Sequence, residues 1–380
     1  MPDAAPQKIK ARGLEGVVAL DTELSHIDGQ KGELIYRGYD IDDLAEKASF
    51  EEVAYLLWKG SLPNAQQLSE LNDMLRSERA LPPAVITLLR EMPEDADPMS
   101  VLQTAVAALG VFDGETADSS PEANYRKAVR LTARIPTLIA AFDRIRKGKD
   151  PIAPLSDGST AYNFVYMLNG ERPGEQADRI FDAALTLHAE HGLNASTFTA
   201  RVIGSTLSDM YSAVAGAIGA LKGPLHGGAN IKVMETLLEI DASGKDPREW
   251  VMEALGRKER IMGFGHRVYK TFDPRARLLR ETSESLADER GQRKWYDISV
   301  AMMETVKSEK GLDPNVDFFS ASVYYMLGID TDLYTPIFAL ARITGWTAHL
   351  LEQWEDNRLI RPSADYVGQR GLTFPALDQR

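Results

Sequence analysis

The spacing of apolar residues along the chain predicts a protein built mainly from helices. In residues 85–92 the apolar positions recur at i, i+3, i+4 and i+7, directly after a proline pair at 82–83 that suits a helix start. Ser49 precedes Glu52 by three residues, which is the pattern of a capping box at another helix start. The same periodicity predicts further helices over 65–78, 99–111, 121–146, 175–191, 229–240, 246–256, 275–290, 294–309, 318–328 and 335–355.

Two segments depart from this amphipathic pattern. Residues 195–221 are rich in small residues and apolar on most sides, which predicts a long, buried central helix or a helix-packing interface. Residues 17–20 and 33–36 are short apolar runs on either side of a turn-rich segment, and they predict a β-hairpin. Because strands do not alternate with the helices, we do not expect a doubly wound sheet. The expected fold class is mostly α with a short N-terminal β-hairpin.

Sharp breaks in the helical pattern predict a division into domains. Residues 223–228 (GPLHGG) and 311–317 (GLDPNVD) are both turn-rich. We expect a smaller helical domain over 224–320, inserted between residues 1–223 and 321–380, which together form a large helical domain. A chain of 380 residues is long enough for two such units. Gly227 and Gly228 are candidates for the hinge between them.

Composition narrows the class of protein. The chain is 44% hydrophobic and 26% charged, which is typical of globular proteins. It has no cysteine, which excludes disulfides, thiolate nucleophiles and cysteine zinc sites. It lacks a long apolar run that could span a membrane, and residues 1–12 lack the apolar core of a signal peptide, so we expect a cytoplasmic protein. A net charge of −13 disfavours nucleic acid as a partner.

One basic stretch stands out in this acidic chain. Residues 256–280 carry eight basic and two acidic residues, which points to a small anionic ligand. At its centre, Gly263-Phe264-Gly265-His266 combines glycines that let the backbone approach a ligand with an imidazole that exchanges protons near neutral pH. Arg275 follows Pro274, where a fixed turn can present a planar fork to a carboxylate. A solvated basic loop is the alternative that charge alone leaves open.

Histidines mark the other candidate positions. His191, His226 and His266 lie next to glycines in turns or at a helix end, whereas we expect a structural role for His26, His188 and His349. His188 and His191 are spaced like a helix-borne metal pair, but the HEXXH pattern and a completing carboxylate are both missing. We therefore predict no metal site.

Taken together, these motifs resemble the citrate synthase family from about residue 13 to the C-terminus. The segments that carry the resemblance occur in one order: HAEHGLNAST (188–197), GPLHGGAN (223–230), GFGHRVYKTFDPR (263–275), PNVDFFS (314–320), FALARITGW (338–346) and LIRP (359–362). The N-terminal segment 34–60 fits the shorter form of the family. The resemblance implies an almost all-α homodimer whose large and small domains close over the substrates.

The resemblance also implies the roles of individual residues. His226, His266 and Asp317 match the catalytic positions. The expected ligands of oxaloacetate are His191, His266, Arg275 and Arg342, with Arg361 contributed across the dimer interface. The backbone segment expected to read the adenine of coenzyme A (CoA) comprises Ile261, Met262, Gly263, Phe264 and Gly265, with Lys270 near the phosphates. No tightly bound cofactor is implied, since the CoA thioester is a co-substrate.

The chemistry of that reaction explains these residue types. Removing a proton from the methyl group of acetyl-CoA requires a base and, at the same moment, a hydrogen-bond donor for the enolate oxygen. Asp317 is the expected base, although on sequence alone it is also a good N-cap for the following helix. His226 is the expected donor to the thioester, and His266 the donor to the ketone of oxaloacetate. The arginines are expected to bind the two carboxylates of oxaloacetate through charge and paired hydrogen bonds.

Two other functions remain open at this point. A 2-methylcitrate synthase shares every motif quoted, and one methylene in an apolar pocket changes discrimination by only about 1–3 kcal/mol. A non-catalytic helical protein that binds acyl-CoA needs the loop at 261–270. It has no use for Asp317 and His226 together with the arginine set, so their joint presence argues against it.

Overall fold

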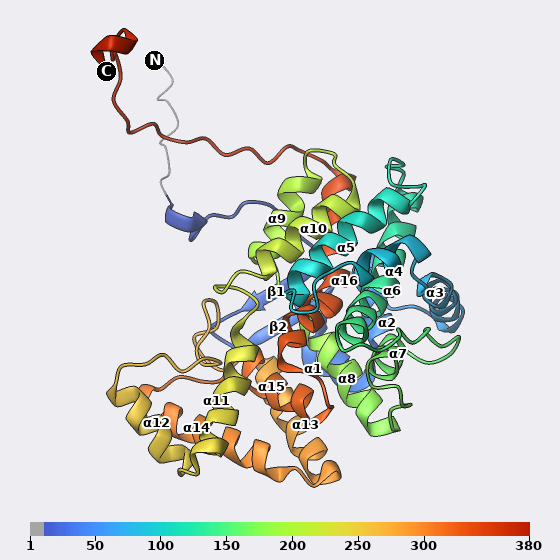
Figure 1. Ribbon diagram of the computed structural model, residues 1–380, viewed down its shortest axis with the longest axis vertical. Coiled ribbons are helices and arrows are strands. Elements are labelled where there is room, and N and C mark those ends of the chain that lie inside the picture. The colour runs from blue at the N-terminus through green and yellow to red at the C-terminus, as the bar shows by residue number, and fades with distance from the viewer. Residues whose placement is uncertain (1–10) are drawn as a thin grey trace.

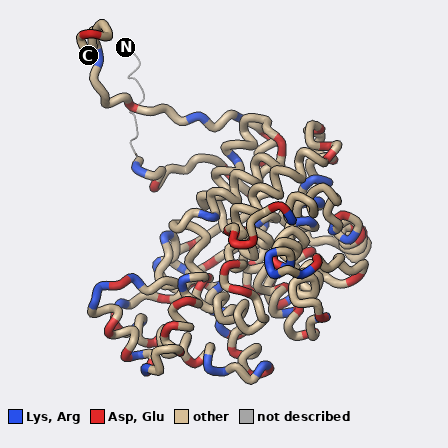
Figure 2. Tube along the Cα trace, viewed as in Figure 1, with Lys and Arg blue, Asp and Glu red and all other residues tan. Residues whose placement is uncertain are grey.

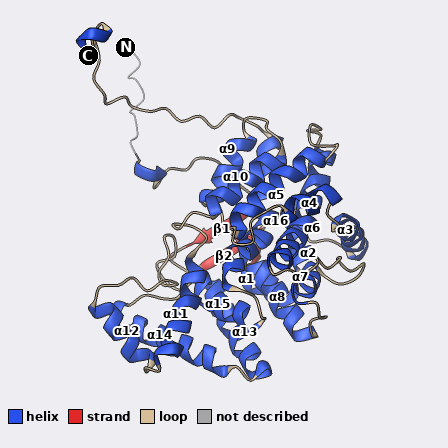
Figure 3. Ribbon diagram, viewed as in Figure 1, coloured by secondary structure: helices blue, strands red, loops and turns tan. Residues whose placement is uncertain are grey.

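The computed structural model describes residues 11–380, and almost all of its regular structure is helical (Figures 1 and 3). This confirms the predicted fold class. The helices, in chain order, are η1 (Arg12–Leu14), α1 (Ile41–Lys47), α2 (Phe50–Lys59), α3 (Ala65–Glu78), α4 (Pro83–Arg90), α5 (Pro98–Phe112), α6 (Pro121–Arg146), α7 (Thr160–Asn169), α8 (Glu175–His188), α9 (Ala195–Gly204), α10 (Met210–Leu221), α11 (Ala229–Ser243), α12 (Pro247–Gly256), α13 (Pro274–Arg290), α14 (Arg293–Lys310), α15 (Val316–Met326), η2 (Thr331–Leu333), α16 (Tyr334–Glu355) and η3 (Leu377–Gln379).

Most of the predicted helices are confirmed, and their ends are set by local chemistry. Helices α3 and α6 begin and end where the periodicity placed them. The capping box at Ser49 is present, because its hydroxyl accepts from Glu52 N and the Glu52 carboxylate accepts from Ser49 N. Helix α4 begins at Pro83, as predicted. Helix α7 was missed; it begins after a Ser159 N-cap.

The predicted central helix over 195–221 is wrong, because the segment forms two helices. Helix α9 ends at Gly204, and α10 begins at Met210. Asp209 is the N-cap of α10, since its side chain accepts from Ser212 N. Between them, Leu207 has a φ of +63°, which no helix accommodates. The two helices pack against each other instead of forming one rod. The small residues serve this packing: a Cβ on Gly216 would lie 2.2 Å from Ile203 Cδ1.

The N-terminal hairpin is present, but its first strand is not where we predicted it. Strands β1 (Ser25–Asp28), β2 (Glu33–Tyr36) and β3 (Tyr39–Asp40) form an antiparallel sheet in which Ser25 lies opposite Tyr36. Residues 17–20 are not a strand, and Val18 is 85% exposed, so this run has no buried face to pair against. The β1–β2 turn reaches the basic stretch, where Lys270 N donates to Gly29 O at 2.8 Å. A Cβ on Gly29 would lie 2.3 Å from Val268 O, so glycine is required there.

Helix α16 is the most buried helix, and it forms the centre of the structure. It packs against α2, α6, α8, α9 and α10 (Figure 1). Apolar side chains surround it, and Trp346 is fully buried with its Nε1–H donating to Ser196 Oγ. The same helix carries the buried polar residues Arg342 and His349. Burying a polar or charged side chain in a packed helix is costly unless it is hydrogen-bonded or paired.

A second group of helices, α11–α15, packs around α15. Helix α15 contacts α11, α13 and α14, while α12 packs on α14 (Figure 1). Helix α13 also contacts α1 and α8, which joins the two groups. Within residues 11–380, no helix is long and apolar enough to cross a membrane. Acidic and basic residues are interspersed along the trace (Figure 2). The predicted absence of a leader concerns residues 1–12, of which residues 1–10 lie outside the described part of the chain.

Candidate functional site

His191 and His226 are positioned by one turn between α8 and α9. His191 opens this turn, and its Nε2 lies 3.2 Å from Tyr269 Oη. At the other end, Asn194 caps α9 by accepting from Thr197 N. Ser196 N donates to His226 Nε2 at 3.3 Å, and Ser196 Oγ lies 2.8 Å from the same nitrogen. Because Nε2 accepts, the proton of a neutral His226 is on Nδ1.

His266 is held in the complementary tautomer. Its Nδ1 accepts from Val268 N at 3.0 Å and from Tyr269 N at 3.2 Å, so the proton of a neutral ring is on Nε2. The rings of His191 and His266 lie 5.2 Å apart, and each contacts the Tyr269 ring. Burial, aided by nearby Arg275, lowers the pKa of His266 to about 4. Burial and Arg342 lower the pKa of His226 to about 4. Both imidazoles are therefore neutral hydrogen-bond donors at pH 7.

Arg275 is fixed by an acidic neighbour that the sequence reading did not single out. Asp273 caps α13, and its carboxylate accepts from Arg275 Nε at 3.0 Å and from Arg275 Nη2 at 2.8 Å. The same carboxylate accepts from Val316 N at 3.2 Å. Burial opposes the charge of Arg275, but Asp273 outweighs it and raises the pKa of the guanidinium. Asp273 thus joins Arg275 to the start of α15.

Arg342 is buried, and most of its hydrogen-bond donors have no partner among the described residues. Its Nε donates to His188 O at 2.7 Å, and its guanidinium lies 4.7 Å from the Phe338 ring. Among the described residues, its two terminal nitrogens have neither a hydrogen bond nor an ion pair. Burial lowers its pKa to about 10, with Glu190 the main group opposing that shift. A buried guanidinium with a free fork is suited to a carboxylate ligand.

Asp317 is free to act because another residue caps its helix. Asn315, not Asp317, is the N-cap of α15, since its side chain accepts from Asp317 N at 3.1 Å. Asp317 Oδ1 is shielded from solvent and has no hydrogen-bond partner among the described residues. Burial raises the pKa of Asp317 to about 7, against the lowering effects of Arg275 and Arg342. A carboxylate with one shielded, unpaired oxygen and this pKa is a candidate general base.

The glycine-rich loop is tied to the same helix start. Asn315 N donates to Gly263 O, Gly265 N donates to Asp313 O, and Asn315 Nδ2 donates to Gly265 O, each at 2.9 Å. Phe264 packs against Phe318 with ring centres 4.6 Å apart and ring planes tilted by 54°. These hydrogen bonds already use the carbonyl of Gly263 and both backbone polar groups of Gly265. In the predicted CoA segment, this leaves the Gly263 N–H and the backbone polar groups of Ile261, Met262 and Phe264 for a ligand.

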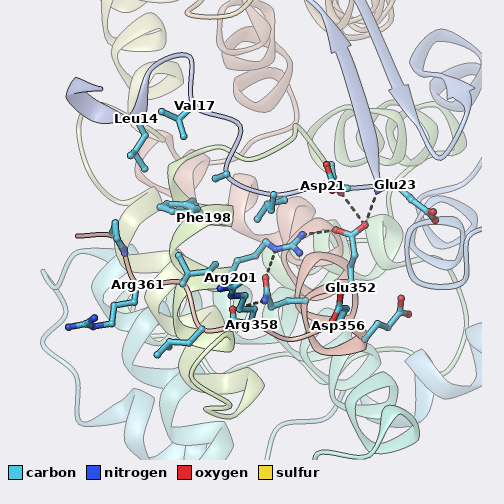
Figure 4. Close-up of a pocket in the computed structure, with 18 of the residues that line it drawn as sticks. Leu14, Val17, Asp21, Glu23, Phe198, Arg201, Glu352, Asp356, Arg358 and Arg361 are labelled. Atoms are coloured by element: carbon cyan, nitrogen blue, oxygen red, sulfur yellow. Dashed lines mark hydrogen bonds and ion pairs between the residues drawn. The ribbon is translucent and has the colours of Figure 1, made fainter. Parts of the chain in front are cut away.

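Two cavities bear on the site. The smaller, of about 240 Å³, lies between the loop 265–273 and the turn 311–314, beside His266 and Lys270. The larger, of about 720 Å³, lies elsewhere, between residues 14–23 and 352–362 (Figure 4). Arg361 lines this larger cavity, is exposed, and extends away from Arg201 and Glu352 in Figure 4. Ring contacts and electrostatic effects link the predicted catalytic and oxaloacetate residues to one another, namely His191, His226, His266, Arg275, Arg342 and Asp317. Within one chain, Arg361 is not part of this group.

Several residues of the site were missed in the sequence reading, namely Tyr269, Asp273, Glu190, Ser196 and Asn315. A usable signal existed for Asp273, because Asp-Pro before Arg275 is a helix N-cap pattern. No local signal exists for Ser196, which meets His226 only through tertiary folding. His188 and His191, which are spaced like a metal pair, have different partners: His188 Nδ1 lies 2.7 Å from Ala184 O, whereas His191 Nε2 lies 3.2 Å from Tyr269 Oη.

Comparison with known proteins agrees with this geometry. The family model described as "Citrate synthase, C-terminal domain" matches residues 13–363. Citrate synthase of Haloferax volcanii is 54% identical over 97% of this chain and 98% of its own. 2-Methylcitrate synthase 1 of Corynebacterium glutamicum is 46% identical over 94% of this chain and 95% of its own. A structure of citrate synthase from Thermoplasma acidophilum, in ternary complex with carboxymethyl-CoA and oxaloacetate, superposes with a TM-score of 0.89 at 35% identity and covers 97% of this chain and 98% of that one. This chain therefore belongs to the citrate synthase family.

Proposed function

We propose that this protein condenses acetyl-CoA with oxaloacetate and water to give citrate and free CoA. The observation that carries the proposal is the carboxylate of Asp317: its Oδ1 is shielded and unpaired among the described residues, and burial raises its pKa to about 7 against the opposing effects of Arg275 and Arg342. Two neutral imidazoles in defined tautomers accompany it. A base, two neutral donors and two cations form the set that a carbon–carbon condensation between a thioester and a dicarboxylate needs.

The first step is proton transfer from carbon. Asp317 takes a proton from the methyl group of acetyl-CoA while His226 donates a hydrogen bond from Nδ1 to the thioester oxygen. Because His226 Nε2 accepts a hydrogen bond from Ser196 N, Nδ1 is the nitrogen that carries the proton and donates it. Because the imidazolium form of His226 has a pKa of about 4, the ring is neutral at pH 7, and its remaining Nδ1–H donates to the enol oxygen.

The second step joins the two substrates. The enol carbon attacks the ketone carbon of oxaloacetate, and His266 donates from Nε2 to the oxygen that gains charge. Arg275 and Arg342 bind the carboxylates, and His191 lies beside His266 as a further polar contact. Water then cleaves the citryl thioester, which releases CoA and citrate. Closure of the predicted domain 224–320 against residues 1–223 and 321–380 excludes water during condensation. The domain bounds and the hinge at Gly227 and Gly228 stay predictions, as does a cytoplasmic location.

Binding of CoA rests on the loop at 261–265. Its free backbone groups at Ile261, Met262 and Phe264 are suited to reading an adenine edge, and Lys270 is exposed next to the cavity beside His266. Within residues 11–380, the Lys270 side chain donates only to Arg267 O, at 3.1 Å, so it remains available to a phosphate.

Arg361 enters the site from the second subunit of a homodimer. Support comes from its position: it is exposed at the larger cavity, apart from the residues around Asp317. We predict complementation when Arg361→Ala chains are refolded together with Asp317→Asn chains. Each heterodimer then has one intact site, so random mixing restores about a quarter of wild-type activity. If the mixture is no more active than the Arg361→Ala and Asp317→Asn homodimers, Arg361 contributes to the site of its own subunit.

Release of free thiol tests the function itself. We expect thiol release from acetyl-CoA only when oxaloacetate is present, and slower release from propionyl-CoA. Faster turnover of propionyl-CoA identifies a 2-methylcitrate synthase, a family to which the chain is also similar. Binding of acyl-CoA without any thiol release identifies a non-catalytic acyl-CoA-binding protein and contradicts the proposal.

A further inference from the structure

A chain of buried polar side chains runs from the wall of the larger cavity to the turn that carries His191. At the cavity, Glu352 accepts from Thr22 Oγ1, Glu23 N and Arg201 Nη1 (Figure 4). Arg201 Nη1 also lies 3.0 Å from His349 Nδ1, and His349 Nε2 lies 3.0 Å from Glu190 Oε1. Glu190 and His349 are fully buried. The proposed reaction gives none of these four residues a role.

Glu190 is the inner end of this chain, and three elements converge on it. Its Oε1 accepts from Ser25 Oγ on β1 at 2.9 Å, from His349 on α16, and from Gly192 N at 2.5 Å. Its backbone is also fixed, since Tyr36 Oη on β2 donates to Glu190 O at 2.6 Å. Glu190 therefore ties the residues on either side of His191 to the hairpin and to α16.

The turn that Glu190 holds supports more than one substrate contact. Gly192 has a φ of +59°, so the chain reverses immediately after His191. Asn194 N donates to Gly192 O at 2.9 Å, and from there the turn leads to Ser196 and hence to His226. Glu190 Oε2 faces α16, where a Cβ on Gly345 would lie 2.4 Å from it and 3.4 Å from Arg342 Cδ. One carboxylate thus adjoins His191 and Arg342 together.

His349 reaches Glu190 as a neutral donor because of Arg201. A guanidinium can only donate, so the contact from Arg201 leaves His349 Nδ1 without a proton and places the ring proton on Nε2. Nε2–H then points at Glu190 Oε1. The outer pair, Arg201 and Glu352, thereby fixes the tautomer of the inner pair.

We propose that Glu190 is a positioning residue for the oxaloacetate site, and that His349, oriented by Arg201, holds Glu190 in place. The inference rests on the proposed function, because it assigns His191 and Arg342 to oxaloacetate. The Glu190 carboxylate fixes the turn at His191 and packs beside Arg342. Both oxaloacetate ligands are therefore held in place before the substrate binds, which lowers the entropic cost of binding.

Charge and geometry make opposite predictions for this residue. Removing a negative charge near the binding site, taken alone, strengthens the binding of a dianion. Removing the anchor weakens it. Glu190→Gln removes the charge but keeps an oxygen that can receive all three hydrogen bonds now made to Oε1. Glu190→Ala removes both charge and anchor, so the pair of variants separates the two effects.

The experiment compares steady-state kinetics and calorimetric oxaloacetate binding in the full-length protein. We expect Glu190→Ala to raise KM and Kd for oxaloacetate by about tenfold or more, with kcat at saturation reduced less. Glu190→Gln is expected to stay within about threefold of wild type. His349→Ala should resemble Glu190→Ala, and the double variant should be no worse than Glu190→Ala, because the two residues act as one unit.

Glu51→Ala is the matched control for loss of a buried glutamate. Glu51 is buried like Glu190, and its Oε1 accepts from a backbone N–H, that of Thr160, at 2.7 Å. We expect it to lower the melting temperature without changing KM for oxaloacetate. An unchanged KM in folded Glu190→Ala overturns the inference, as do additive effects in the double variant or an equal KM increase in Glu51→Ala. Failure of the wild type to bind oxaloacetate contradicts the proposed function instead.

Discussion

Asp317→Asn should lower the condensation rate by roughly 10²–10⁴-fold, the range typical for loss of a general base. The amide has nearly the shape of the carboxylate but does not accept a proton from carbon. Asp317 makes no hydrogen bond through Oδ1 among the described residues, so the substitution breaks no native contact there. Steady-state thiol release and calorimetric titration with oxaloacetate measure the two consequences. Oxaloacetate binding should be nearly unchanged, since the base is not one of its ligands.

The stability of this variant provides the control. Because burial raises the pKa of Asp317 to about 7, the folded protein binds a proton more tightly than the unfolded chain. The stability contributed by the protonated group is therefore lost as pH rises from the ordinary carboxyl value through about 7. Asn carries no charge, so Asp317→Asn should melt no lower than wild type at pH 8. A lower melting temperature together with weaker oxaloacetate binding indicates a structural role for Asp317.

The same pKa predicts a pH dependence of the wild-type enzyme. Only the ionised carboxylate accepts a proton, so kcat/KM for acetyl-CoA should fall as pH drops below about 7. The two imidazoles have pKa values of about 4 and stay neutral over this range. A flat profile between pH 6 and 8 contradicts the assignment of Asp317 as the base.

Arg342→Met should weaken oxaloacetate binding by at least about thirtyfold, because a buried carboxylate of the substrate loses its cation at a cost of about 2–5 kcal/mol. Methionine fills a similar volume against Phe338, so the core stays packed. The only protein hydrogen bond removed within the described residues is that to His188 O. The measurement is the calorimetric Kd for oxaloacetate, with KM at saturating acetyl-CoA as a second readout.

Arg342 is a better test than Arg275. Replacing Arg275 leaves Asp273 as a buried charge with no cation, which costs about 3–5 kcal/mol of stability and blurs any effect on binding. Lys270→Met is the matched control, since it removes a cation near the site that is exposed and not assigned to oxaloacetate. If the Arg342→Met protein binds oxaloacetate as tightly as the wild type, Arg342 is not a ligand of oxaloacetate. Equal weakening by Lys270→Met indicates a general charge effect instead.

Local patterns were enough to predict most of the helices. Periodicity and capping depend on neighbours in sequence, so α3, α6 and the capping box at Ser49 could be predicted. The split of 195–221 could not, because small apolar residues suit a buried helix and a helix-packing surface equally well. The first hairpin strand was misplaced for a related reason: an apolar run such as 17–20 forms a strand only if the fold gives it a face to bury.

The catalytic set could be predicted only as a list of residue types. From the sequence, Asp317 could be either a catalytic base or the N-cap of the following helix. The structure shows that Asn315 caps α15. The tautomers of His226 and His266 depend on Ser196 and on the backbone at 268–269, contacts that no spacing rule supplies. Likewise, the buried chain from Glu352 to Glu190 joins residues more than 150 positions apart.

The central claim is that Asp317 removes a proton from the thioester methyl group in a site already filled by a dicarboxylate. Incorporation of solvent deuterium into the methyl of acetyl-CoA tests this most directly, in the presence of a four-carbon dicarboxylate that lacks the ketone and so cannot be attacked. We predict exchange that depends on the dicarboxylate in the wild-type protein and no detectable exchange in Asp317→Asn. Exchange at the wild-type rate in Asp317→Asn would contradict the account.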